Sequence, residues 1–126
     1  MSPAGAYVGG VLAPGIEVSM EALFERAARL VKVDYVEPPQ VIGKTTAGAL
    51  QSGLVYGFAG QVDGIVGRIR EELGLEAQTV ATGGLADLIV PHARTLETMA
   101  WGEIGPCGDG PGFQNYTYPL LLLLFL

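Results

Sequence analysis

Short apolar runs alternate with amphipathic segments along the chain, and this pattern predicts an α/β protein. Apolar residues recur at intervals of three and four over residues 20–30 and again over residues 62–73, which is the spacing of one helix face. Ser19 precedes the first segment as its expected N-cap, and Gly74 follows the second as its expected C-cap. Two amphipathic helices are therefore expected.

Strands are expected in three short apolar runs, at residues 7–12, 31–36 and 79–82. Two glycine-centred phrases accompany them: Gly-Gly-Val-Leu-Ala-Pro-Gly at residues 9–15 and Val-Ala-Thr-Gly-Gly-Leu-Ala at residues 80–86. Glycines in such phrases permit a tight turn and the close approach of a ligand or another backbone. Both phrases predict that a buried strand leaves its sheet and enters a helix, which after the second phrase is a short helix over residues 85–89.

Residues 46–61 form an uncharged segment of helical character, with Thr46 as its expected N-cap. Ala49, Gly53 and Gly57 fall four residues apart, so one face of this helix carries almost no side-chain bulk. Such a stripe indicates close packing, either against a second subunit or within one subunit, and the pattern does not separate the two. The segment is shorter than the roughly 20 apolar residues of a membrane span, and no membrane is expected as a partner.

Composition narrows the classes of function. The 126 residues suit one domain with its own core. The net charge is −6, and seven lysines and arginines are spread without a basic stripe, so nucleic acid is not expected as a partner. One cysteine and one histidine supply neither a disulfide framework nor a zinc site, which favours a reducing, cytoplasmic setting. No signal peptide is expected, because the first residues lack a basic region followed by an apolar core.

Candidate chemistry is confined to glycines and one threonine. Gly43-Lys44-Thr45 is similar to the end of a phosphate-binding P-loop, but that loop needs a glycine where this chain has Pro38. Gly83 and Gly84 fit the wall of an adenosine site, because backbone without side chains can lie against a flat base. From these residues alone, a tight turn that binds nothing is the more frequent explanation of such a pair. No carboxylate lies in a phrase that predicts a tuned pKa, so no catalytic acid or base is assigned.

These phrases, in this order, resemble type III pantothenate kinases of the actin-like ATPase superfamily. The resemblance runs from about residue 7 to residue 96 and rests on these stretches: residues 9–16, 19–28, 38–46, 51–57 and 81–85. It implies the C-terminal half of such an enzyme: a partial actin-like (ribonuclease H-like) ATPase domain, with a mixed sheet and flanking helices. It divides the chain into an incomplete C-terminal domain at residues 1–98 and an irregular tail at residues 99–126 that is not typical of the family.

The resemblance also implies a function. The family transfers the γ-phosphate of ATP to the 4′-hydroxyl of pantothenate, giving 4′-phosphopantothenate in the first step of coenzyme A biosynthesis, and works as a homodimer. The threonine matching Thr46 contacts pantothenate in the neighbouring subunit's site, and Gly83 and Gly84 match the stretch near adenosine. ATP is used with Mg²⁺, and a monovalent cation, K⁺ or NH₄⁺, is bound.

Three family motifs are absent from these 126 residues: Asp-x-Gly-Asn-Thr, Gly-Ala-Asp-Arg and Asp-x-Gly-Thr-Ala-x-Thr. They carry the phosphate, substrate, cation and general-base contacts, so this truncated chain is expected to be inactive alone, and a shifted reading frame or a fragmentary gene would explain both ends. Two alternatives stay open. One is a non-catalytic dimerisation module that uses the Ala49, Gly53 and Gly57 stripe, and the other is a fragment of a different actin-like sugar or acid kinase.

Overall fold

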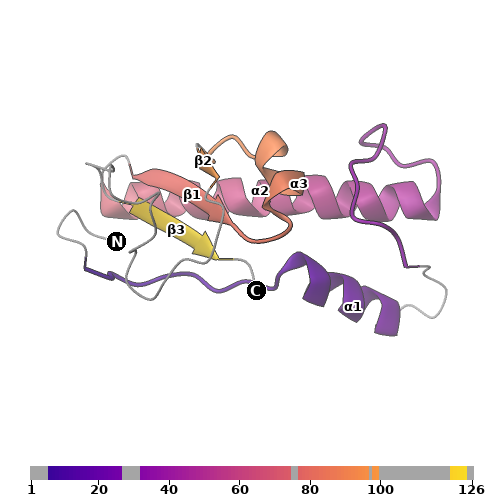
Figure 1. The fold of residues 1–126 in the computed structure, drawn as a ribbon, viewed down its shortest axis with the longest axis horizontal. Helices are drawn as coiled ribbons and strands as arrows, with labels where there is room; N and C mark the ends of the chain where they lie inside the picture. The colour runs from indigo at the N-terminus through magenta and orange to yellow at the C-terminus, as the bar shows by residue number, and fades with distance from the viewer. Residues whose placement is uncertain (1–5, 27–31, 75–76, 97, 100–119, 125–126) are drawn as a thin grey trace.

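One long helix organises the described part of the chain (Figure 1). The computed structural model describes residues 6–26, 32–74, 77–96, 98–99 and 120–124. Its elements are, in chain order, α1 (Ile16–Arg26), α2 (Thr46–Leu73), β1 (Gln78–Thr82), α3 (Ala86–Ile89), the 3-10 helix η1 (Val90–His92), β2 (Thr98–Met99) and β3 (Leu120–Leu124). In Figure 1 α2 spans most of the width of the molecule, with β1 along its left half, α3 near its middle and α1 below its right half.

Helix α2 joins two segments that the sequence pattern predicts separately. Its 28 residues run without a break, because no proline interrupts them. The helical assignments are confirmed, as is Gly74, which closes the helix in the left-handed conformation with φ of 64°. The predicted N-cap is wrong by one residue: the Thr45 hydroxyl, not that of Thr46, accepts the hydrogen bond from the Gly48 amide, at 3.0 Å.

Helix α1 begins earlier than expected. The Gly15 carbonyl oxygen accepts a hydrogen bond from the Ser19 amide (3.0 Å), so the first turn is already formed there and the predicted cap at Ser19 is wrong. Glu17 lies in this first turn, where a carboxylate favours the helix dipole. Met20 is fully buried as expected, whereas Leu23 is largely exposed. Residues 27–30 of the predicted helix lie outside the described residues.

Two of the three predicted strands are absent. Residues 7–12 and 32–36 are neither helix nor strand, and residue 31 lies outside the described residues. The first of these runs is also not buried, since the exposed fractions of Tyr7 and Leu12 are 78% and 88%. A strand needs a neighbour for its backbone hydrogen bonds, and the strands that the structure describes pair only with one another.

The third predicted strand is confirmed as β1, the centre of a sheet with the order β2-β1-β3. Both pairings are parallel; Val80 lies opposite Thr98 on one side and opposite Leu122 on the other. No regular element is expected beyond residue 98, yet Leu120–Leu124 forms β3, so that expectation is wrong for the leucine run. Most of the predicted irregular tail lies outside the described residues, and the division at residue 98 stays a prediction.

The core lies where α2 meets the other elements. Leu54, Phe58, Ala59, Val62 and Val66 give α2 one continuous buried face. Against it pack buried side chains from α1, the segment after it, α3 and the loop beyond η1: Ile16, Met20, Val33, Ile89 and Ala93. Among the described residues, no helix is long and apolar enough to cross a membrane.

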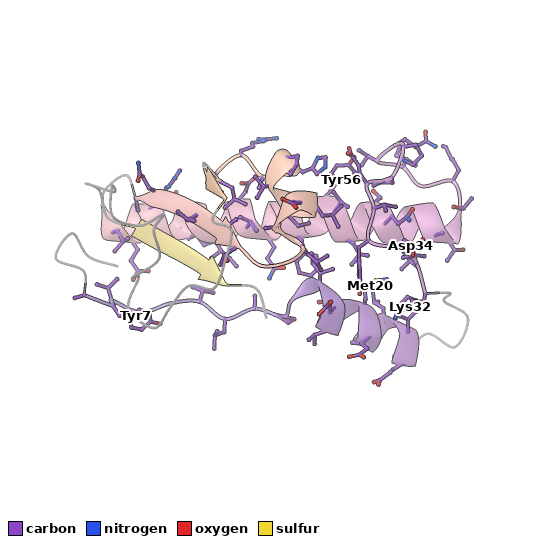
Figure 2. The ribbon with its side chains drawn as sticks, in the orientation of Figure 1. Tyr7, Met20, Lys32, Asp34 and Tyr56 are labelled. Carbon is purple, nitrogen blue, oxygen red and sulfur yellow. The ribbon has the colours of Figure 1, made fainter. Side chains whose placement is uncertain are left out.

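Residues 32–45 form a connection that is tied to α2 by side-chain hydrogen bonds (Figure 2). The Gln51 side-chain nitrogen, Nε2, donates to the Asp34 carbonyl oxygen at 3.2 Å, and the buried Ser52 hydroxyl donates to the Val41 carbonyl oxygen. Further along, the Tyr56 hydroxyl donates to Glu37 at 3.5 Å. The path of this connection is therefore set by α2.

The small-residue stripe lies on the exposed side of α2. Ala49, Gly53 and Gly57 are all exposed, and a Cβ at either of these glycines would meet nothing within 4 Å. Gly60, Gly64 and Gly67 continue the spacing of three and four, which extends the stripe along the helix. Gly43 rests against Ala49 at one end of the stripe and the Arg68 guanidinium lies against Gly64, whereas a Cβ at Gly53, Gly57, Gly60 or Gly67 would meet nothing within 4 Å.

Candidate functional site

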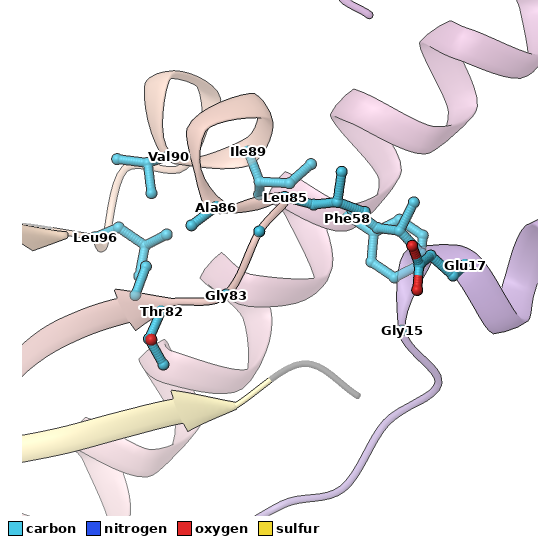
Figure 3. Close-up of a pocket in the computed structure, with 13 residues that line it drawn as sticks. Gly15, Glu17, Phe58, Thr82, Gly83, Leu85, Ala86, Ile89, Val90 and Leu96 are labelled. Carbon is cyan, nitrogen blue, oxygen red and sulfur yellow. The ribbon is translucent and has the colours of Figure 1, made fainter. Parts of the chain in front are cut away.

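The glycine turn after β1 opens onto a cavity of about 150 Å³ (Figure 3). At Gly83 φ is 116°, a left-handed conformation that side chains disfavour, and the Gly83 carbonyl oxygen accepts a hydrogen bond from the Ala86 amide at 3.1 Å. A Cβ at Gly83 or Gly84 would meet nothing within 4 Å. The backbone of this turn therefore borders open space, where a flat group can approach it.

Three separate parts of the chain build the cavity. Gly15, Ile16 and Glu17 contribute the beginning of α1, and Phe58 contributes the buried face of α2. The remaining walls are the end of β1, the glycine turn, α3 and Leu96. The cavity thus brings Gly15, from the first glycine phrase, together with the turn of the second.

The lining is mostly apolar, and its polar side chains are those of Thr82 and Glu17. A cavity of about 150 Å³ is large enough to hold a benzene ring, whereas whole-ligand pockets measure roughly 300–1,000 Å³. The Glu17 carboxylate repels phosphate at this short range. The cavity therefore suits one uncharged ring system, not a triphosphate.

Thr46 lies apart from this cavity. It is the first residue of α2 and is exposed, and it is not among the lining residues. Phe58 follows it by twelve residues, a separation of about 18 Å along a helix. The structure therefore brings Gly83 and Gly84 together with the cavity but places Thr46 at a second location.

The Gly43-Lys44-Thr45 phrase has a structural explanation. A Cβ at Gly43 would overlap the backbone of Gly48 and Ala49, so the α-carbon of Gly43 rests against the first turn of α2. Thr45 caps the same turn. Glycine is required here for close approach to the chain's own helix.

Asp63 holds the chain beyond η1 against α2. One oxygen of its carboxylate, Oδ1, accepts hydrogen bonds from the Thr95 amide at 2.9 Å and from the Thr95 hydroxyl at 2.8 Å. Partial burial raises the pKa of the Asp63 carboxyl, but hydrogen bonds from the Arg94 and Thr95 amides and the Thr95 hydroxyl, with the charge of Arg94, outweigh it. The net pKa lies below its ordinary value.

Several residues of the site are not foreseen from the sequence. From the sequence, Gly15 is expected to serve in a turn that leads into a helix, and neither Leu96 nor Asp63 is singled out. The dipeptide Pro14-Gly15 predicts a turn at Gly15, but no neighbouring residue indicates which distant segment this turn contacts. Among the described residues, no three His, Cys, Asp or Glu side chains cluster in a way that holds a metal ion.

Comparison with known proteins identifies the family. A family model described as type III pantothenate kinase matches residues 1–68. The chain is 58% identical over 97 residues to the type III pantothenate kinase of Frankia alni, covering 77% of this chain and 39% of that protein. The proteins of the same name from Myxococcus xanthus and Moorella thermoacetica are 49% and 50% identical over 99 residues, covering 79% of this chain and 39% of each relative.

The chain thus spans about two fifths of the length of these curated relatives, each covered to 39%. The resemblance drawn from the order of the glycine phrases is confirmed. Because the family model covers more than half of its 126 residues, the chain belongs to the type III pantothenate kinase family.

Proposed function

We propose that this chain acts in the ATP-dependent phosphorylation of pantothenate, the activity for which its relatives are named. In this reaction the γ-phosphate of ATP is transferred to the 4′-hydroxyl of pantothenate, giving 4′-phosphopantothenate for coenzyme A biosynthesis. The observation that carries the proposal is the cavity in which the two glycine phrases of the family resemblance meet. We also propose that the chain forms part of an actin-like domain with a mixed sheet, as the family resemblance implies.

The cavity is proposed to hold the adenosine part of ATP. Gly83 and Gly84 leave backbone open to a flat base, and Phe58 and Leu96 give apolar surface for the ring. The Glu17 carboxylate can accept a hydrogen bond from a ribose hydroxyl, while its charge directs the phosphates away from this wall. These features together support adenosine as the ligand.

Thr46 is proposed to contact pantothenate, whose carboxylate carries a negative charge. Thr46 is the first residue of a 28-residue helix, so the positive end of the helix dipole lies beside it. Lys44 precedes it by two residues and adds a positive charge to the same exposed region. Both features attract a carboxylate.

The phosphate-transfer machinery is proposed to lie outside these residues. Phosphoryl transfer depends on positioning and on stabilising the charge of the phosphates, and the three family motifs that do so are absent from the 126 residues. Among the described residues, no three His, Cys, Asp or Glu side chains are grouped to hold a metal ion, and no step is assigned to Mg²⁺ or to a monovalent cation here. This chain's own contribution is to bind and orient the two substrates.

Calorimetric titration with adenosine and with ATP tests the cavity. Both are expected to bind with similar affinity, because the chain contacts the nucleoside and not the phosphates. Gly84→Val should abolish binding, since its side chain would occupy the cavity, and Gly84 has no positive φ that would strain the variant. Glu72→Val, at an exposed position of α2 outside the stripe, is the matched control. Absence of adenosine binding to the wild-type chain would refute the assignment.

Turnover is tested separately, by mass spectrometry of 4′-phosphopantothenate. The chain alone is expected to give no product, and product is expected when a polypeptide that carries the three absent motifs is added. Product from the chain alone would show that its own residues supply the phosphate contacts.

A second proposal concerns assembly as a homodimer. The stripe that begins with Ala49, Gly53 and Gly57 is open along α2, which favours packing between two copies over packing within one. Sedimentation velocity should show a dimer, and Gly57→Leu should shift it to monomer while retaining helicity, because leucine favours helices more than glycine does. Glu72→Leu, exposed on the same helix, is the control. A monomeric wild-type chain would refute this proposal.

A further inference from the structure

One wall of the cavity comes from a connection that is neither helix nor strand. Leu96 lines the cavity, and residues 93–96 lead to it after η1 ends at His92. Figure 3 shows Leu96 above the end of β1, on the side of Ala86 and Val90. A side chain on such a segment is not held by a ladder of backbone hydrogen bonds, so its position depends on other contacts.

Asp63 of α2 supplies two of those contacts, and the Leu96 side chain also packs against the hydrophobic core. Thr95, the residue before Leu96, donates both its amide and its hydroxyl hydrogen to Oδ1 of Asp63. Bonds to an ionised acceptor are about twice as strong as bonds between neutral groups. The two bonds also fix the backbone and the side chain of Thr95 together, so the direction in which Leu96 leaves the backbone is fixed with them.

Asp63 does not itself line the cavity, whereas Phe58, five residues earlier on the same helix, does. Helix α2 therefore supplies one wall directly and holds another through Thr95. We propose that Asp63 is a positioning residue for nucleotide binding, which keeps Leu96 in place as the surface on which the adenosine ring packs. This role rests on the proposed function of the cavity.

A purely structural role for Asp63 has different consequences. It would lower the stability of the whole fold without a specific change at Leu96 or in adenosine affinity. Positioning instead predicts that the segment around Thr95 opens locally and that binding weakens while the rest of α2 and its core remain folded.

The experiment compares the full chain with Asp63→Ala, Asp63→Asn and Thr95→Val, with Asp87→Ala on the exposed face of α3 as the matched control. Adenosine is the probe, titrated by calorimetry, and amide hydrogen exchange is measured at Thr95 and Leu96 and along α2. Asp63→Ala is expected to weaken adenosine binding about tenfold, the order of effect that a small misplacement of a positioned group produces. Asn keeps an acceptor oxygen, so Asp63→Asn should restore most of the affinity.

The exchange measurement separates the two roles. Faster exchange at Thr95 and Leu96 with unchanged exchange in the middle of α2 supports positioning, and Thr95→Val should give a smaller effect in the same direction. Unchanged adenosine affinity in Asp63→Ala overturns the role of Asp63 while leaving the adenosine site intact. A wild-type chain that does not bind adenosine overturns the site itself, and the role of Asp63 with it.

Discussion

At the scale of single residues, Gly43 has the closest backbone neighbours of the glycines in the described part of the chain. Gly43→Ala places a methyl group onto the backbone of Gly48 and Ala49, which cannot move without opening the first turn of α2. We expect a loss of about 1–3 kcal/mol in the free energy of unfolding, as for other overpacked sites. Urea denaturation measures it.

The control for this prediction is Glu72→Ala, at an exposed position of α2 outside the stripe. It should change the stability by less than about 0.5 kcal/mol, as surface substitutions away from special features usually do. Equal effects of the two substitutions would contradict the close packing at Gly43.

Asp63 makes stability depend on pH. Its pKa is lowered in the folded chain, so its contribution is present above the ordinary pKa of aspartate, about 3.9, and disappears as the pH falls through the lower folded value. The stability difference between the wild type and Asp63→Asn, from urea denaturation, should be constant from about pH 7 to pH 5 and shrink below about pH 4. A difference that stays constant down to about pH 2 would show that the Thr95 contacts do not need the charge.

At the scale of elements, local signals predict helices and turns correctly, and strands only in part. The apolar spacing of residues 62–73 and the cap at Gly74 are carried by neighbours within one turn, and both are confirmed. The run at residues 7–12 has the composition of a strand, but a strand is completed by a distant partner that its own residues do not specify. For the same reason, the sequence does not predict β3, whose partner is the distant strand β1.

The N-cap of α2 shows that the sequence does not decide between two adjacent residues of the same type. Thr45 and Thr46 carry the same hydroxyl, and geometry alone selects Thr45, because its oxygen reaches the Gly48 amide. Thr45→Ala should therefore lower the stability by about 1 kcal/mol, whereas Thr46→Ala should leave it nearly unchanged. Thermal unfolding followed by circular dichroism compares the two; a larger loss for Thr46→Ala would contradict the observed cap.

At the scale of the whole molecule, the candidate site is an assembly of distant segments. The sequence indicates Gly83 and Gly84, because a glycine pair after a buried strand is a local pattern. It does not indicate that Gly15 and Leu96 share their cavity, since that depends on how α1 and the connection after η1 pack on α2. Thr46 keeps its predicted role only as a proposal, at a separate place on α2.

The bare stripe on α2 affects how the stability of the protein depends on its concentration. Five glycines beyond the first turn lower the stability of the helix by about 5 kcal/mol relative to alanine. In a single copy, no contact with another subunit offsets this loss. In the proposed homodimer, two copies would close over the stripe, so folding would be coupled to association and the stability of the fold would depend on the protein concentration. The melting temperature should then rise by several degrees between about 1 µM and 100 µM chain, and a midpoint independent of concentration would contradict this. Dilution alone would then make each copy easier to unfold.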